Sequence, residues 1–115
     1  MNALEIAVFA LALAGGNDPF ICQLQMDRVS CTNGYVASRN GQGNIEFDNG
    51  VEVLRLMDGT LAFSNGITTH WGSAGWVQFS TGLSVRRDRD GSFRFSNGMV
   101  CRAEGNMAAI CARKS

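Results

Sequence analysis

Apolar and polar residues alternate along most of this chain, and glycine turns separate the alternating runs. Phenylalanine recurs every 16 residues, and an Asn-Gly or Thr-Gly pair follows two residues later each time, at Phe47, Phe63, Phe79 and Phe95. The same spacing extends back to Cys31, which precedes Asn33-Gly34, and forward to Cys111. A fixed period of this kind indicates one small structural unit repeated along the chain.

Each 16-residue unit is predicted to contain two short strands joined by tight turns. In the unit from Val51 to Phe63, short alternating runs on either side of Asp58-Gly59 are typical of half-buried strands. Asn-Gly and Asp-Gly pairs between such runs are strong hairpin signals. About twelve strands can be counted between Phe20 and Cys111, which predicts a single antiparallel meander.

A three-residue loop at each turn predicts a register that the sequence itself can check. With residues 64–66 as a loop, Phe63 faces Ile67, and with residues 57–59 as a loop, Val53 faces Phe63. Apolar residues then meet at odd-numbered positions almost everywhere. Even-numbered positions are mostly polar, with the exceptions Leu54, Val100 and Ile110. The register is strongly specified because a slip of one residue would turn every side chain to the other face.

A long meander with one apolar face has to cover that face. Closing the sheet into a barrel does so and also removes the exposed edges. A barrel of about twelve strands is too wide for its own side chains to fill. We therefore expect an all-β, shallow barrel that is filled by the ring of phenylalanines, by a central helix or by a ligand.

The segment before the repeats is apolar from Ala3 to Ala14 except for Glu5. It is too short to span a bilayer as a helix, so no integral membrane span is expected. Its length and small residues before Gly15 predict a signal peptide over residues 1–14, cleaved after Ala14, although basic residues are missing. A β-hairpin repeat domain would then cover residues 15–115. The alternatives are an apolar helix retained in the barrel core, which its all-round apolar character would suit, and a membrane anchor.

Four cysteines in 115 residues fit an oxidising compartment, so the protein is expected to be periplasmic or secreted. The register places Cys22 opposite Cys31 and Cys101 opposite Cys111, each pair across one terminal hairpin. Two local disulfides are therefore the favoured pairing. The alternative joins Cys31 to Cys111, because these two residues occupy the phenylalanine position of the first and last repeats and would be neighbours in a closed ring.

The Phe-Ser-Asn-Gly and Asp-Gly punctuation over residues 31–111 resembles that of MORN-type β-hairpin repeats, although the Tyr-x-Gly signature is absent and the period is shorter. The one-sided meander is also similar to the shallow barrels called β-flowers, and more distantly to tubby-type barrels threaded by an apolar helix. These resemblances imply a barrel of glycine-turned hairpins. Because architecture does not carry function, no functional residue is transferred from these families.

Charge and composition exclude several function classes. Ten Lys and Arg balance ten Asp and Glu, so no global field favours nucleic acid. The only histidine, His70, has an outward, even-numbered position, so no nucleophile pair is expected around it. The cysteines lack the close pairs of structural zinc sites. We expect no catalytic residues, no metal and no cofactor.

Arginines in one position of the repeat are the strongest candidates for binding chemistry. Arg39, Arg55 and Arg87 share this position, and Trp71 occupies it in another repeat. Their odd numbers place them on the apolar face near the Asp-Gly turns, as part of a ring at one barrel mouth. Guanidinium groups there can bind a carboxylate or phosphate bidentately. The simpler interpretation is that their stems lie on apolar residues while the charged heads reach water.

Trp76 follows the glycine-rich loop 72–75 at an outward position. It is either a partner-binding residue or an ordinary packed residue. The favoured function is that of an exported, non-enzymatic structural or interaction module with an unknown protein partner. The alternative is a protein that binds a small anionic or apolar ligand in the barrel interior or at the arginine-lined mouth. The sequence does not indicate an oligomeric state.

Overall fold

The fold is seen in a computed structural model that describes residues 2–113. Helix α1 (Ala3–Ala14) precedes twelve strands, and the short 3-10 helix η1 (Ser73–Gly75) lies between β7 and β8. The strands are β1 (Phe20–Gln25), β2 (Arg28–Cys31), β3 (Val36–Arg39), β4 (Ile45–Phe47), β5 (Glu52–Arg55), β6 (Leu61–Phe63), β7 (Thr69–Trp71), β8 (Val77–Phe79), β9 (Ser84–Arg87), β10 (Phe93–Phe95), β11 (Met99–Glu104) and β12 (Ala108–Arg113). They form one antiparallel sheet, which confirms the predicted all-β meander.

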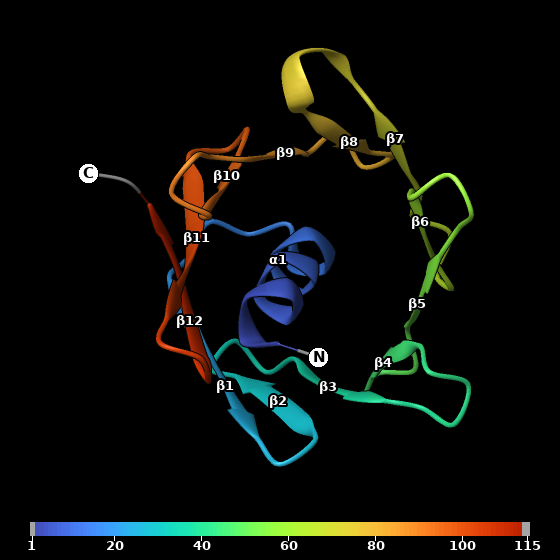
Figure 1. Ribbon diagram of the computed structural model, residues 1–115, viewed down its shortest axis with the longest axis vertical. Coiled ribbons are helices and arrows are strands. Elements are labelled where there is room, and N and C mark those ends of the chain that lie inside the picture. Colours follow the sequence, from blue (N-terminus) through green and yellow to red (C-terminus); the bar gives the residue numbers. More distant parts are fainter. Residues whose placement is uncertain (1, 114–115) are drawn as a thin grey trace.

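The sheet curves into a nearly closed barrel around α1 (Figure 1). Strands that are consecutive in the chain are neighbours, and β1 also pairs with β12, with Phe20 opposite Cys111. The seam lies between β6 and β7, where a single bridge joins Ala62 to Thr68. The Thr69 hydroxyl supports this seam by accepting a hydrogen bond of 2.8 Å from the backbone N–H of Leu61. The predicted barrel is confirmed, and its weakest joint lies midway along the chain.

The register follows the predicted three-residue loops. Ile45 lies opposite Val53, and Val53 lies opposite Phe63. In a representative turn, the Asn65 side chain accepts a hydrogen bond of 3.1 Å from the backbone N–H of Ile67. Gly66 has a φ of 99°, which glycine adopts at little cost because it has no Cβ. The buried residues of the inward ring include Phe47, Phe63, Phe79, Val85 and Phe95.

In three repeats, a serine after the phenylalanine hydrogen-bonds to the start of the neighbouring strand. Ser64 accepts a hydrogen bond of 2.8 Å from the Glu52 N–H at its hydroxyl, and its own N–H donates to the Glu52 carbonyl at 2.8 Å. Ser80 and Ser96 make the same pair of contacts to the residue 12 positions earlier. Successive residues of the Phe-Ser-Asn-Gly unit therefore supply a core side chain, a link between neighbouring strands and a turn.

Helix α1 lies inside the barrel. The Asn2 side chain caps its start by accepting a hydrogen bond of 2.7 Å from the Glu5 N–H, and Gly15 ends it with a φ of 65°. Eight of its 12 residues are buried, as expected for a helix that is apolar on nearly all sides. This arrangement is the retained-helix alternative, whereas cleavage after Ala14 stays a prediction. No helix within residues 2–113 is long and apolar enough to cross a membrane.

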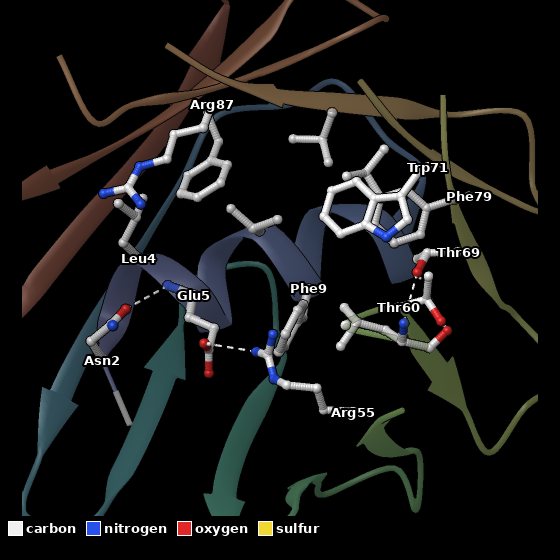
Figure 2. A pocket seen from close by; sticks show the side chains of 16 residues that line it. Asn2, Leu4, Glu5, Phe9, Arg55, Thr60, Thr69, Trp71, Phe79 and Arg87 are labelled. Carbon is white, nitrogen blue, oxygen red and sulfur yellow. Dashed lines mark hydrogen bonds and ion pairs between the residues drawn. The ribbon is translucent and has the colours of Figure 1, made fainter. Parts of the chain in front are cut away.

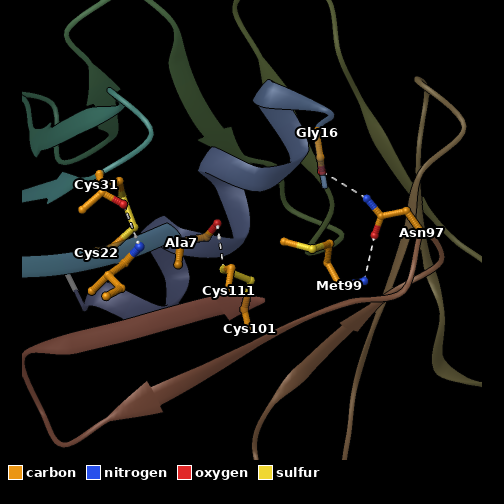
Figure 3. Close-up of a disulfide and its surroundings, with 10 residues drawn as sticks. Ala7, Gly16, Cys22, Cys31, Asn97, Met99, Cys101 and Cys111 are labelled. Atoms are coloured by element: carbon orange, nitrogen blue, oxygen red, sulfur yellow. Dashed lines mark hydrogen bonds between the residues drawn. A yellow bond between two sulfur atoms is a disulfide. The ribbon is translucent and has the colours of Figure 1, made fainter. Parts of the chain in front are cut away.

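The helix sits off-centre, against the strands from both ends of the chain. It contacts β1, β2, β11 and β12. Ala3, Ala7, Ala10 and Ala14 recur at helical spacing on the face opposite the cavity-lining residues of α1, and their small side chains permit a close approach. Figure 3 shows the result at Ala7, whose carbonyl oxygen lies 3.9 Å from the Sγ atom of Cys111.

Both predicted local disulfides form beneath this helix. Cys22 is bonded to Cys31, and Cys101 is bonded to Cys111, so no cysteine within the described chain is free. The alternative bond between Cys31 and Cys111 is wrong, because each of these cysteines lies directly opposite its own hairpin partner. Two disulfides are compatible with an extracellular location.

Candidate functional site

A cavity of about 370 Å³ remains between α1 and the strands β5–β10, on the side from which the helix leans away. The helix lines it with Leu4, Glu5, Val8 and Phe9 (Figure 2). Small-molecule pockets in proteins commonly have volumes of about 300–1,000 Å³. The partial filling of the barrel by α1 therefore leaves a space of ligand size.

The walls of the cavity are predominantly apolar. Phe9 from the helix packs edge-on against Phe63 of β6, with the ring centroids 5.8 Å apart. The remaining apolar lining comes from the inward positions of the opposite strands, at Leu61, Val77, Phe79, Val85 and Phe93. An apolar group that enters the cavity would exchange water for these side chains, which is favourable in proportion to the area buried.

The mouth carries the charged and polar groups. Arg55 pairs with Glu5 across the opening, at 3.5 Å between Nη2 and Oε2 (Figure 2). The Arg87 guanidinium lies 5.8 Å from the centroid of the Phe93 ring, and no described residue forms an ion pair with it. Two arginines and one glutamate are the charged residues among those that line the cavity, which leaves one net positive charge.

These mouth residues share a position because each one ends its strand. Arg55 ends β5, Trp71 ends β7 and Arg87 ends β9. Because these residues have odd numbers, their side chains point to the inner face of the sheet. Because they end their strands, they also reach water, and Trp71 is 62% exposed. The Trp71 indole N–H donates a long hydrogen bond of 3.4 Å to the Asp58 carbonyl. The geometry thus permits each arginine to lay its aliphatic stem on an apolar wall while its guanidinium group reaches the opening.

The structure brings together three of the four residues predicted for the mouth. Arg55, Arg87 and Trp71 line one cavity, whereas Arg39 does not. Arg39 ends β3 on the same rim, but β3 pairs with β2, against which α1 packs. The off-centre helix therefore decides which arginines share a space.

Two threonines at the cavity have no counterpart in the sequence prediction. Thr60 and Thr69 are 8% and 7% exposed, and both line the cavity. The Thr60 hydroxyl donates to Asp58 Oδ1 at 2.6 Å, and the Thr60 N–H donates to the same atom at 3.0 Å. These two hydrogen bonds, the hydroxyl first, lower the pKa of Asp58 below its ordinary value. The sequence Asp58-Gly59-Thr60 could have indicated this arrangement, because the matching sequence Asp90-Gly91-Ser92 makes the same two hydrogen bonds.

Glu5, Val8 and Phe9 were also missed as lining residues, because their segment was expected to be cleaved. His70 is exposed, as its even position predicts, with Nε2 2.9 Å from Oε1 of Gln78. Trp76 is half-buried, and the Arg94 guanidinium lies 6.0 Å from the centroid of its ring. Its role in partner binding stays a prediction. Among residues 2–113, no three His, Cys, Asp or Glu side chains are grouped so as to hold a metal ion.

No protein-family model, curated protein or solved structure matches the chain. The chemistry of the cavity is therefore the basis for assigning a function.

Proposed function

We propose that the protein binds a small amphiphilic monoanion in the cavity beside α1. The observation that carries this proposal is an apolar space of about 370 Å³ whose opening holds the guanidinium of Arg87, which no residue within 2–113 pairs with. An apolar tail suits the walls, and a single carboxylate suits the one net positive charge of the lining. This is the ligand-binding alternative, and the cavity favours it over a purely structural or interaction role.

Arg87, rather than Arg55, is the expected partner of the ligand's head group. Arg55 is already paired with Glu5, whereas Arg87 lies over the face of an aromatic ring and forms no ion pair with a described residue. A bidentate carboxylate on Arg87 would add charge-assisted hydrogen bonds without breaking an existing ion pair. The charge of Glu5 also disfavours a second negative charge at the mouth.

Isothermal titration calorimetry with hexanoate, octanoate and decanoate tests the fit of the tail. Each methylene that enters the cavity contributes about 0.8 kcal/mol, which is roughly a fourfold gain in affinity. We expect this gain along the series until the cavity is full. An affinity that does not change with chain length would contradict a buried tail.

Arg87→Gln tests the head group. Octanoate should bind about tenfold more weakly, because a hydrogen-bonded charge pair is lost, while 1-octanol should bind unchanged. Arg39→Gln is the matched control, because Arg39 has the same repeat position and is exposed but does not line the cavity. Equal octanoate affinity for Arg87→Gln and the unmodified protein would refute the assignment of Arg87. Failure of every member of the series to bind would refute the ligand-binding function.

A further inference from the structure

Large apolar side chains on the surface gather at one rim of the barrel. The mouth rim is defined here as the turns that connect each odd-numbered strand to the next strand, together with the strand ends that flank them. These turns are residues 26–27, 40–44, 56–60, 72–76, 88–92 and 105–107. Of the seven large hydrophobic residues that are exposed within residues 2–113, five lie there: Met26, Leu56, Met57, Trp71 and Met107. The other two, Ile21 and Leu54, lie on the outer wall, and the turns of the opposite rim have none.

Three methionines are the most prominent members of this set. Met26, Met57 and Met107 are 95%, 107% and 56% exposed. They belong to three hairpins, β1–β2, β5–β6 and β11–β12. The first and last of these are neighbours, because β1 pairs with β12 and the Leu24 N–H donates to the Met107 carbonyl at 2.7 Å, whereas β5–β6 lies well apart from them around the ring (Figure 1). Met26 also has a φ of 60°, a left-handed conformation that costs a residue other than glycine about 1 kcal/mol. Folding therefore explains neither the apolar character nor the exposure of these tips.

The arrangement of the tips suits a fluid surface better than a protein groove. One groove would have to reach two separated places on the ring, the neighbouring tips of Met26 and Met107 and the distant tip of Met57, whereas a lipid surface receives each protruding side chain independently. Tryptophan, which the mouth rim carries at Trp71, is enriched at membrane–water interfaces. The cavity opens at the same rim, so an amphiphile that leaves a lipid surface there would meet the cavity directly.

The charge of the rim indicates which lipid surface it would suit. Five acidic residues and five arginines lie in its turns and flanking strand ends: Asp27, Asp58, Asp88, Asp90, Glu104, Arg28, Arg39, Arg55, Arg87 and Arg89. Recognition of anionic lipids requires a cluster of cations, and this balance does not provide one. A neutral, zwitterionic surface is therefore the better match.

We propose that the mouth rim docks on the surface of a neutral lipid bilayer, with Met26, Met57 and Met107 inserted among the head groups. This docking goes beyond ligand binding in the cavity and does not depend on it, because none of the three methionines lines the cavity. The strength of such docking scales with the apolar area that enters the interface. Each fully inserted methionine contributes about a tenfold gain in partitioning.

Co-sedimentation with phosphatidylcholine vesicles tests the proposal. The unmodified protein should sediment with the vesicles, and the triple variant Met26→Gln, Met57→Gln, Met107→Gln should partition at least about tenfold more weakly. Ile21→Gln is the matched control: it removes an apolar residue that is 42% exposed on the wall, and it should partition like the unmodified protein. Addition of phosphatidylglycerol should change partitioning by less than about threefold.

Four results would overturn the proposal. The first is that the unmodified protein does not bind phosphatidylcholine vesicles, and the second is that the triple variant binds them as well as the unmodified protein does. The third is that binding requires an anionic lipid. The fourth is that light scattering shows self-association of the unmodified protein and that the triple variant abolishes it. The last result would assign the rim to contacts with a second copy. Octanoate calorimetry on the triple variant should be unchanged, so a failure of lipid docking and a failure of ligand binding are seen in separate experiments.

Discussion

Replacing Ile6 by alanine tests whether α1 is part of the folded protein. Ile6 is 0% exposed inside the barrel. Truncating such a side chain removes its transfer free energy and leaves a cavity, which together cost about 2–4 kcal/mol. A domain of this size loses about 4 °C in unfolding midpoint per kcal/mol. We therefore expect the midpoint to fall by about 8–16 °C.

Ile21→Ala is the control for the same chemical change. Ile21 is 42% exposed on the outer face of β1, so its truncation should cost less than about 1 kcal/mol. Thermal unfolding followed by circular dichroism, with both disulfides intact, compares the two variants directly. A selective effect of Ile6→Ala would place α1 in the cooperative core.

Equal midpoints for Ile6→Ala and the unmodified protein would refute the argument that α1 stabilises the barrel. Intact-mass measurement on protein recovered from an exporting host separates the two possible reasons. Loss of residues 1–14 in a folded protein would confirm a cleaved signal peptide and exclude the retained helix. A full-length mass with no change in stability would mean that the helix is present but does not support the fold.

Two further predictions concern turns and can be measured by the same unfolding assay. Gly66→Ala should destabilise by about 1 kcal/mol, because its φ of 99° strains any residue with a Cβ, whereas Gly16→Ala, without a positive φ, should have little effect. Asp58 has a pKa lowered by Thr60, so its contribution to stability is present above its ordinary pKa and is lost as the pH falls through the lower folded value. Asp58→Asn should therefore reduce the loss of stability below about pH 4. Identical acid sensitivity in Asp58→Asn and the unmodified protein would contradict the assignment.

The register and the disulfides were predictable because both depend on short-range arithmetic. Strand parity determines which face a residue occupies, and loop length determines which residue lies opposite. The bonds Cys22–Cys31 and Cys101–Cys111 close only 9 and 10 positions along the chain, within this arithmetic. The links made by Ser64, Ser80 and Ser96 were not foreseen, because their even positions indicate only a polar outer face.

The role of the first segment was not decidable from its residues. A signal peptide and a buried helix both require an apolar run of about twelve residues, so composition alone does not separate them. The structure adds the missing quantity, which is the width of the lumen that the strands leave unfilled. Glu5, Val8 and Phe9 consequently entered the candidate site only when the helix was placed.

By itself, the sequence determined the hairpin repeat, the inward face and the position of the arginines at one mouth, and it favoured the local disulfides, because each of these depends on neighbouring residues. Only the tertiary structure decided that Arg55 and Arg87 share a cavity that Arg39 does not line. That outcome depends on where α1 lies across the lumen, and therefore on contacts such as that between Ala7 and Cys111, which are 104 positions apart. Local periodicity carries no information about packing over such a separation, because that packing depends on side-chain size on two surfaces that meet only in the folded barrel.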